Sequence, residues 1–169
     1  MSEGYNFIKI VFVLLVVFSL FACDSPDQTK VIRDPVAFEK VDECHVCGMV
    51  ITRFPGPKAQ AFETRNNQMK KFCSTIELMY WYLQPENRVN VDSVFVHDMS
   101  HSPWDKPDDG LLIDASKAYY VIGSDLQGSM GKTLATFSSK AATEGFILEH
   151  GGRLVGFEML TLDLLAQQL

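Results

Sequence analysis

The sequence is poor in basic residues, in cysteine and in long apolar runs, and each shortage excludes a class of protein. Its 15 Lys and Arg face 21 Asp and Glu, for a net charge of -6, so electrostatic capture of nucleic acid is not expected. The apolar run from Ile10 to Ala22 has 13 residues, whereas a transmembrane helix needs about 20. Only one pair of the four cysteines has the C-x-x-C spacing, so a zinc site built from two such pairs is excluded. The 169 residues are nonetheless 47% hydrophobic, which excludes a largely disordered chain.

The apolar run has the length of a signal-peptide core. It ends in Leu20-Phe21-Ala22-Cys23, after which the chain becomes polar. A leucine three places before a cysteine, with a small residue directly before it, resembles a bacterial lipoprotein cleavage site. We therefore expect residues 1–22 to be removed, Cys23 to carry lipid, and residues 23–40 to form the anchor and a flexible tether. A signal anchor with an incidental cysteine is the alternative.

Beyond residue 40, strand and helix patterns follow one another. The expected strands are Met49–Thr52, Ala59–Thr64, Gln68–Phe72, Val91–Val96, Tyr119–Ile122, Leu134–Phe137 and Arg153–Glu158, with a hairpin turn at Asn66-Asn67. Ser74 and Glu77 form a capping-box pattern that opens a helix ending at Pro85. A second helix is expected over residues 138–150, closed by Gly151-Gly152, and a short one at the C-terminus. Asp98–Gly110 is expected to be a loop.

The chain also carries a weak internal similarity. Four positions match four others 65 residues later, three by identity and one by an aromatic side chain. Phe72, Ser74, Trp81 and Leu83 correspond to Phe137, Ser139, Phe146 and Leu148. In both places a strand pattern runs into a helix pattern. We therefore predict an α+β fold of two small related strand-plus-helix units of ββαβ type, over residues 41–90 and 91–169.

The densest group of chemically active residues is Cys44-His45-Val46-Cys47-Gly48-Met49. A thioredoxin-like redox pair should open a helix, whereas a strand pattern follows here. A structural zinc site would need two further ligands, which Cys73 and a histidine could supply. A Cu(I) site can be made from two or three soft thiolate and thioether ligands. A plain disulfide between Cys44 and Cys47 is the fourth alternative.

Further donors lie elsewhere in the chain. Three methionines stand in or beside loop-like stretches rather than on apolar stripes, namely Met49, Met99 and Met130. Ser129-Met130-Gly131 is the clearest case, because a thioether in such a loop has little reason to pack. His97 at a strand end and His101 in the following loop could join a metal site, since imidazole also suits copper. Cys73, at a helix start, is either a reactive thiol or a buried small residue.

Further short segments follow one another along the chain in a characteristic order. They are the lipoprotein site with Cys23, then Cys44–Met49, Ala59-Gln60-Ala61, Val96-His97-Asp98, Trp104, Ile113-Asp114-Ala115, Ala118–Ser124, Ser129-Met130-Gly131, Phe137 and Gly151-Gly152. In this order and spacing, the segments resemble the NosL lipoproteins, copper chaperones that accompany nitrous oxide reductase. The resemblance covers nearly all of the mature chain and does not depend on any single segment. The family implies two strand-and-helix units, similar to the C-terminal part of organomercurial lyases.

The resemblance also implies a function. It implies a Cu(I) metallochaperone without catalytic turnover, lipid-anchored, facing the periplasm, and delivering copper to nitrous oxide reductase or its assembly machinery. The ligands implied for this chain are Cys47, Met49 and Met130, then Cys44, and the further candidates are His97, His101 and Cys73. Two positions depart from the family pattern. Ser129 stands where proline is frequent, and Cys73 stands where an acidic residue is common, which raises the possibility of an additional ligand.

Two other functions fit the same residues. A thiol-based enzyme, similar to organomercurial lyases or acting in disulfide exchange, would need Cys73 close to Cys44 or Cys47 and no essential methionine. A zinc-stabilised structural lipoprotein would contain zinc and unfold on chelation.

Overall fold

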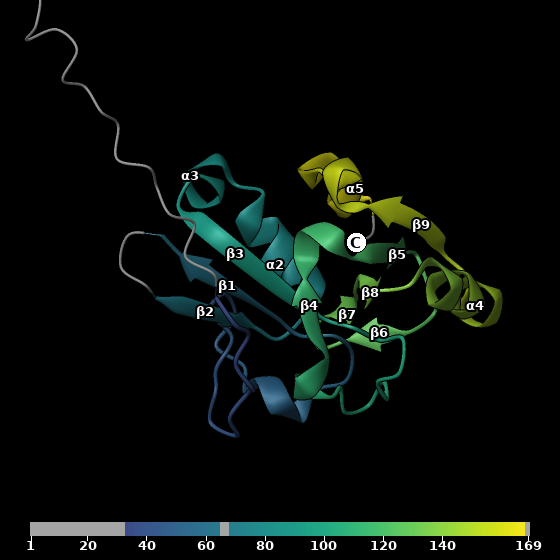
Figure 1. Cartoon of the computed structure of the whole chain (residues 1–169), viewed down its shortest axis with the longest axis horizontal. Helices are drawn as coiled ribbons and strands as arrows, with labels where there is room; N and C mark the ends of the chain where they lie inside the picture. The colour runs from purple at the N-terminus through teal and green to yellow at the C-terminus, as the bar shows by residue number, and fades with distance from the viewer. Residues whose placement is uncertain (1–32, 65–67, 168–169) are drawn as a thin grey trace, which may run out of the picture. The chain divides into compact units, whose positions relative to one another are not determined.

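Two antiparallel sheets, each packed against a helix, form the framework of the described chain (Figure 1). The computed structural model describes residues 33–64 and 68–167. The expected signal sequence, Cys23, most of the tether and the Asn66-Asn67 turn lie outside these residues. Among the described helices, none has the length and apolar character required to cross a membrane.

The first sheet contains four strands in the order β2-β1-β3-β4. They are β1 (Ala59–Glu63), β2 (Met69–Phe72), β3 (Val91–His97) and β4 (Leu112–Asp114). Ala59 lies opposite both Phe72 and Val96, and all three are fully buried, so one face of this sheet points into the core. The helix α2 (Thr75–Tyr82) follows β2 and begins at Ser74, whose side chain accepts a hydrogen bond from the Glu77 amide. The expected antiparallel pairing of β1 with β2 and the capped helix are thereby confirmed.

The second sheet has the order β8-β5-β9 and packs against the helix α4. Its elements are β5 (Tyr119–Ile122), β8 (Ala135–Phe137), α4 (Lys140–His150) and β9 (Arg153–Gly156). A small ribbon of β6 (Gln127–Gly128) and β7 (Gly131–Lys132) makes the third sheet. The α4 helix begins at Ser139, whose hydroxyl accepts from the Ala142 amide. In both larger sheets, therefore, an edge strand runs into a serine-capped helix.

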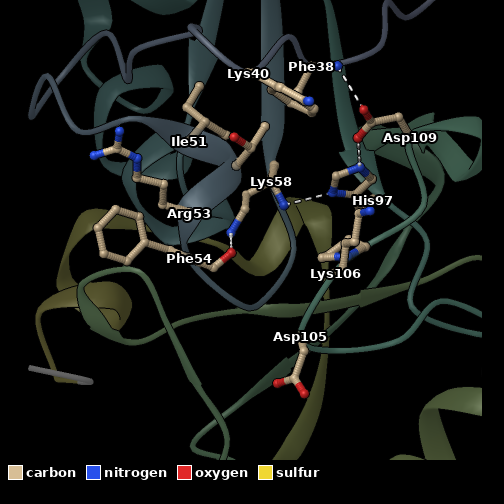
Figure 2. Close-up of a pocket in the computed structure, with 12 residues that line it drawn as sticks. Phe38, Lys40, Ile51, Arg53, Phe54, Lys58, His97, Asp105, Lys106 and Asp109 are labelled. Carbon is tan, nitrogen blue, oxygen red and sulfur yellow. Dashed lines mark hydrogen bonds and ion pairs between the residues drawn. The ribbon is translucent and has the colours of Figure 1, made fainter.

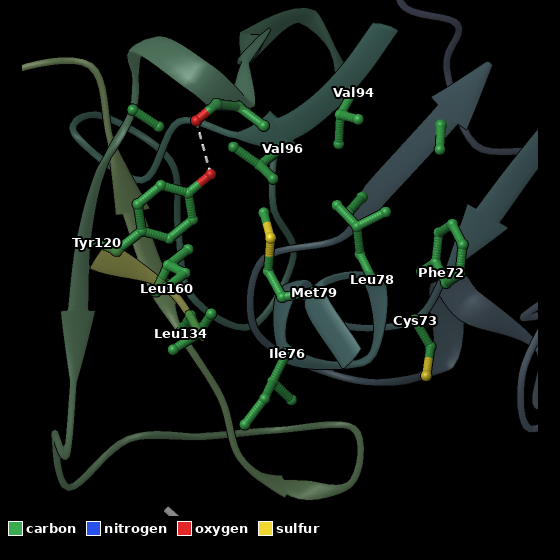
Figure 3. Close-up of a cluster of buried hydrophobic side chains, with 14 of the residues drawn as sticks. Phe72, Cys73, Ile76, Leu78, Met79, Val94, Val96, Tyr120, Leu134 and Leu160 are labelled. Carbon is green, nitrogen blue, oxygen red and sulfur yellow. Dashed lines mark hydrogen bonds between the residues drawn. The ribbon is translucent and has the colours of Figure 1, made fainter. Parts of the chain in front are cut away.

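One hydrophobic cluster joins the two larger sheets (Figure 3). Its labelled members include Phe72, Leu78, Met79, Val96, Tyr120, Leu134 and Leu160. The Tyr120 hydroxyl is buried in this cluster and donates to the Ala115 carbonyl at 2.7 Å. Each large apolar side chain buried in this way stabilises the folded state by roughly 1.5–3 kcal/mol relative to an exposed one. The described residues belong to a single compact unit, and this cluster holds its sheets together.

Several elements differ from the sequence prediction. Met49–Thr52 is not a strand, because Val50 makes only an isolated bridge with Glu43 and Ile51–Arg53 is a 3-10 turn, η2. A one-turn helix, α3 (Pro85–Arg88), begins at the proline expected to end the previous helix, since proline suits a first helical position. The sequence patterns also missed strand β4 and the β6–β7 ribbon, because these strands are only two or three residues long.

The mixed α+β class is confirmed, with three small antiparallel sheets. The division of the chain at residue 90 does not follow these sheets. Strand β3 lies between β1 and β4 in the first sheet, so that sheet extends to Asp114. The remaining short elements are η3 (Asp109–Leu111), η4 (Ala115–Lys117), η5 (Phe157–Met159) and α5 (Leu162–Ala166).

Candidate metal centre

The C-x-x-C-G-M segment forms a tight loop that turns its two thiols toward the same region. The Cys44 amide donates to the Met49 carbonyl at 2.9 Å, and the Gly48 amide donates to the Cys44 carbonyl at 2.9 Å. Gly48 has φ +72°, a left-handed conformation that side chains rarely adopt. The loop is fixed to strand β2 because the His45 amide donates to the Lys71 carbonyl at 2.8 Å. It therefore lies beside the end of β2.

That end of β2 supplies two more groups. Cys73 lies between Phe72 and the helix cap Ser74, and Glu77 occupies the first turn of α2, four residues further on. The Sγ atoms of Cys47 and Cys73 are 3.6 Å apart, and Cys73 Sγ lies 2.6 Å from Glu77 Oε2. The same carboxylate oxygen is 3.3 Å from Cys44 Sγ and 3.9 Å from Cys47 Sγ. Glu77 is thus within reach of all three thiols.

One ligand atom from each of Cys44, Cys47, Cys73 and Glu77 lies within 4.8 Å of the other three. All three cysteines are free thiols, so the structure contains no Cys44–Cys47 disulfide. Cys44 and Cys73 are buried, whereas Cys47 and Glu77 are partly exposed. The Ser129 hydroxyl approaches from the β6–β7 ribbon and lies 2.9 Å from Cys73 Sγ. The group therefore has a closed inner side and an accessible side, and it can hold a soft metal ion.

The close approach of these groups changes their ionisation. As a hydrogen-bond donor, Cys73 lowers the pKa of Cys44 to about 4. The same hydrogen bond, together with burial, raises the pKa of Cys73. Burial is the main cause that raises the pKa of Cys47 and of Glu77. At neutral pH the group thus contains one thiolate, Cys44, and two thiols that retain their protons.

The predicted methionines lie in different surroundings. Met130 is in the turn between β6 and β7, directly after Ser129, and is 56% exposed. Met49 is partly buried and packs against the main hydrophobic cluster. Met99 is buried with Val121 and Phe137 in a second cluster, so packing accounts for it. Only Met130 combines an exposed thioether with a neighbour that contacts the thiol group.

The predicted histidines lie outside the thiol group. His97 is buried, and both its ring nitrogens have partners, since Nδ1 accepts from the Lys58 amide and Nε2 contacts Asp109 Oδ1. With both nitrogens engaged, His97 serves the packing of β3 in this arrangement and offers no lone pair to an ion. His101 is exposed in the loop after β3. His45 stands edge-on to Phe72 and Trp81, with ring centroids 5.9 and 5.7 Å away.

The sequence analysis missed Glu77 as a member of the site, because it assigned that residue only to the helix cap. The backbone amide of Glu77 does take part in the cap, but its side chain extends to the thiols. The signal that could have revealed it is the i, i+4 spacing of Cys73 and Glu77, which places two side chains on the same side of a helix start.

Comparison with known proteins identifies the family to which the chain belongs. A family model described as NosL matches residues 35–165. The chain belongs to the NosL family. The resemblance seen in the sequence is therefore confirmed, over the whole region that contains both larger sheets and the thiol group.

Two curated NosL relatives and one solved NosL structure are similar over most of their length. The chain is 49% identical over 154 residues to the copper-binding lipoprotein NosL of Stutzerimonas stutzeri, covering 91% of this chain and 80% of that protein. It is 30% identical over 157 residues to the copper-binding lipoprotein NosL of Achromobacter cycloclastes, with the same coverages of 91% and 80%. The crystal structure of the copper chaperone NosL from Shewanella denitrificans has a TM-score of 0.76 at 43% identity, covering 78% of this chain and 98% of that one. These NosL proteins are copper-binding proteins and a copper chaperone, in agreement with the prediction of a protein that is not an enzyme.

Proposed function

We propose that this NosL-family chain is a Cu(I) chaperone, anchored by lipid on Cys23 and facing the periplasm, that delivers copper for the maturation of nitrous oxide reductase. The observation that carries the proposal is the group of three thiols within reach of one another. Thiolates select Cu(I), and two or three of them suffice to bind it. The copper-binding names of the NosL relatives support the same choice of metal.

The proposed ligand set starts from Cys44, Cys47 and Cys73. Their sulfur atoms meet where the C-x-x-C loop lies beside the end of β2. Met130 and Met49 are proposed as additional thioether ligands, Met130 at the exposed edge of the site. A chaperone must release its cargo, and partial exposure of Cys47 would allow a partner's ligand to approach the ion. Glu77 is proposed to accept hydrogen bonds from the Cys73 and Cys47 thiols.

The experiment that tests this function is a transfer assay. The chain is loaded with one equivalent of Cu(I) under anaerobic conditions and mixed with copper-free nitrous oxide reductase together with its assembly machinery. We expect the reductase to gain copper and activity, and a Cys44→Ser variant to deliver much less. Equal activation by free copper at the same concentration would contradict a role in delivery.

A thioether at the edge of the site should contribute less than a buried thiolate. We expect Met130→Leu to weaken Cu(I) binding by about tenfold, which corresponds to about 1.4 kcal/mol. The measurement is an anaerobic titration against a competing chelator. Met159→Leu is the matched control, because Met159 is also exposed, at 67%, but lies in η5. If both variants bind as the unsubstituted chain does, Met130 is not a ligand.

The protonation of the thiols predicts how copper affinity depends on pH. Cys47 and Cys73 have raised pKa values, so they must each lose a proton to bind Cu(I) as thiolates. Cys44, with its pKa lowered to about 4, is already ionised. We expect log K to rise by about two per pH unit between roughly pH 6 and 8, and by about one in Cys47→Ser, in which Cys73 still keeps Cys44 ionised. Affinity that does not change with pH would exclude these thiols as ligands.

We further propose that the chain contains two related strand-plus-helix units. The proposal is supported by Ser74 and Ser139, which cap α2 and α4 at corresponding places after an edge strand. Residues 1–22 are proposed as a lipoprotein signal peptide and residues 23–40 as the anchor and tether. The end of this tether is bound to the folded unit, because the Val36 and Phe38 amides donate to Gln60 and Asp109. Mass spectrometry of the mature protein would test this processing, because the expected mass is that of a chain beginning at a lipid-modified Cys23.

A further inference from the structure

The structure also contains a pocket that is not lined by any residue of the thiol group. Its volume is about 580 Å³, and it lies among η2, the turn after it and the loop that leads to η3 (Figure 2). The lining includes neither a cysteine nor Glu77. Pockets that bind small molecules commonly have volumes of 300–1,000 Å³. This pocket is therefore large enough for a small organic ligand.

Positive charge dominates the lining. Four basic side chains surround the pocket, Lys40, Arg53, Lys58 and Lys106. Lys58 is only 3% exposed, and its Nζ donates to the carbonyls of Phe54 and Pro55, each at 2.7 Å. Within residues 33–64 and 68–167, none of the four forms an ion pair with a carboxylate. A buried ammonium with neutral partners alone is costly, and burial accordingly lowers the pKa of Lys58 to about 8.

The acidic side chains of the lining do not balance this charge. Asp109 is held by other groups, since its Oδ2 accepts from the Phe38 amide at 2.8 Å and its Oδ1 lies 3.1 Å from His97 Nε2. Asp105 is the other carboxylate of the lining. Four cations and two carboxylates leave an excess of about two positive charges. The chain as a whole carries a net charge of -6, so this local excess opposes the general trend.

We propose that this pocket binds a small organic dianion, a phosphate monoester or a dicarboxylate, that also carries an apolar group. The dianion would balance the excess charge of the four basic side chains. The apolar group would contact the hydrophobic part of the wall, formed by Phe38, Ile51, Phe54 and Pro107. A guanidinium can hold two oxygens of a phosphate or carboxylate at once, so Arg53 would set the orientation of the ligand.

The test uses the mature lipidated protein in a non-ionic detergent and isothermal titration calorimetry. The probes are phenyl phosphate and phenylsuccinate, and benzyl alcohol serves as the uncharged probe. We expect one or both dianions to bind saturably at one site and benzyl alcohol not to bind. Binding of only one dianion would identify the phosphate or the dicarboxylate as the ligand class. Absence of saturable binding by both dianions up to about 10 mM would overturn the proposal.

Two variants and one control locate the binding. Arg53→Gln changes an exposed side chain and should weaken binding of the dianion about fivefold or more. Lys58→Met should weaken it about tenfold or more, and circular dichroism shows whether this buried substitution folds. Lys140→Gln, on the exposed surface of α4, should leave the affinity within about twofold. If Arg53→Gln binds as tightly as Lys140→Gln, the dianion does not bind in this pocket.

Discussion

A Cys44→Ser variant is expected to bind Cu(I) about a hundredfold more weakly than the unsubstituted chain, a loss of about 2.7 kcal/mol. Cys44 is only 3% exposed, and it is the thiol that is already ionised at neutral pH. A serine hydroxyl of similar size is a hard, protonated donor that Cu(I) does not favour. The measurement is an anaerobic competition titration with a chelator of known affinity.

The control for this variant is Val46→Ser, in the same loop. Val46 is 53% exposed and its side chain is not a ligand, so a new hydroxyl there should leave Cu(I) affinity unchanged. Circular dichroism of both variants establishes that the fold is retained. Affinity in a folded Cys44→Ser variant equal to that of Val46→Ser would exclude Cys44 as a copper ligand.

The largest loss of stability is expected for Gly152→Ala, between α4 and β9. Gly152 has φ +88°, and a Cβ atom there would lie 2.7 Å from the Ile122 carbonyl oxygen and 2.8 Å from Val121 Cγ1. Both neighbours belong to the central strand β5, so they have little freedom to move. We expect the free energy of unfolding to fall by about 4 kcal/mol, from backbone strain and the collision together. Urea unfolding followed by circular dichroism measures the change.

The adjacent glycine provides the matched control. Gly151 also has a positive φ, +69°, but no atom lies within 4 Å of the position that its Cβ would take. Gly151→Ala should therefore cost only the backbone strain, about 1–2 kcal/mol. Equal losses in the two variants would mean that contact with β5 has no part in the effect.

Sequence patterns predicted the elements whose signals are local. The capping box at Ser74 and the apolar spacing after it predicted α2, and the position of α4 was predicted in the same way. Strand β4 escaped prediction because its three residues pair with β3 across a loop, and nothing nearby in the chain marks that pairing. The 3-10 turn η2 was mistaken for a strand because a short apolar run fits both structures.

The candidate site was predictable to a similar extent. The C-x-x-C spacing of Cys44 and Cys47 is local, and it is enough by itself to indicate that the two thiols share a site. The proximity of Cys73 to these two thiols depends on the hydrogen bond between His45 and Lys71, which joins the loop to β2. That bond is a contact between segments that are distant in the sequence. His97 was expected as a possible ligand because its residue type suits copper. Its actual partners, Lys58 and Asp109, are 39 and 12 residues away along the chain and could not be inferred from its neighbours.

The origin of the three thiols in two separate segments has a mechanical consequence. Cys44 and Cys47 belong to a loop, whereas Cys73 is rigidly placed between a strand and a helix. An ion held by all three would act as a crosslink that restrains the loop, and its departure would release that restraint. Loading would therefore raise resistance to unfolding and to proteolysis of the loop. A receiving partner would therefore meet a more restrained loop on a loaded chain than on an empty one.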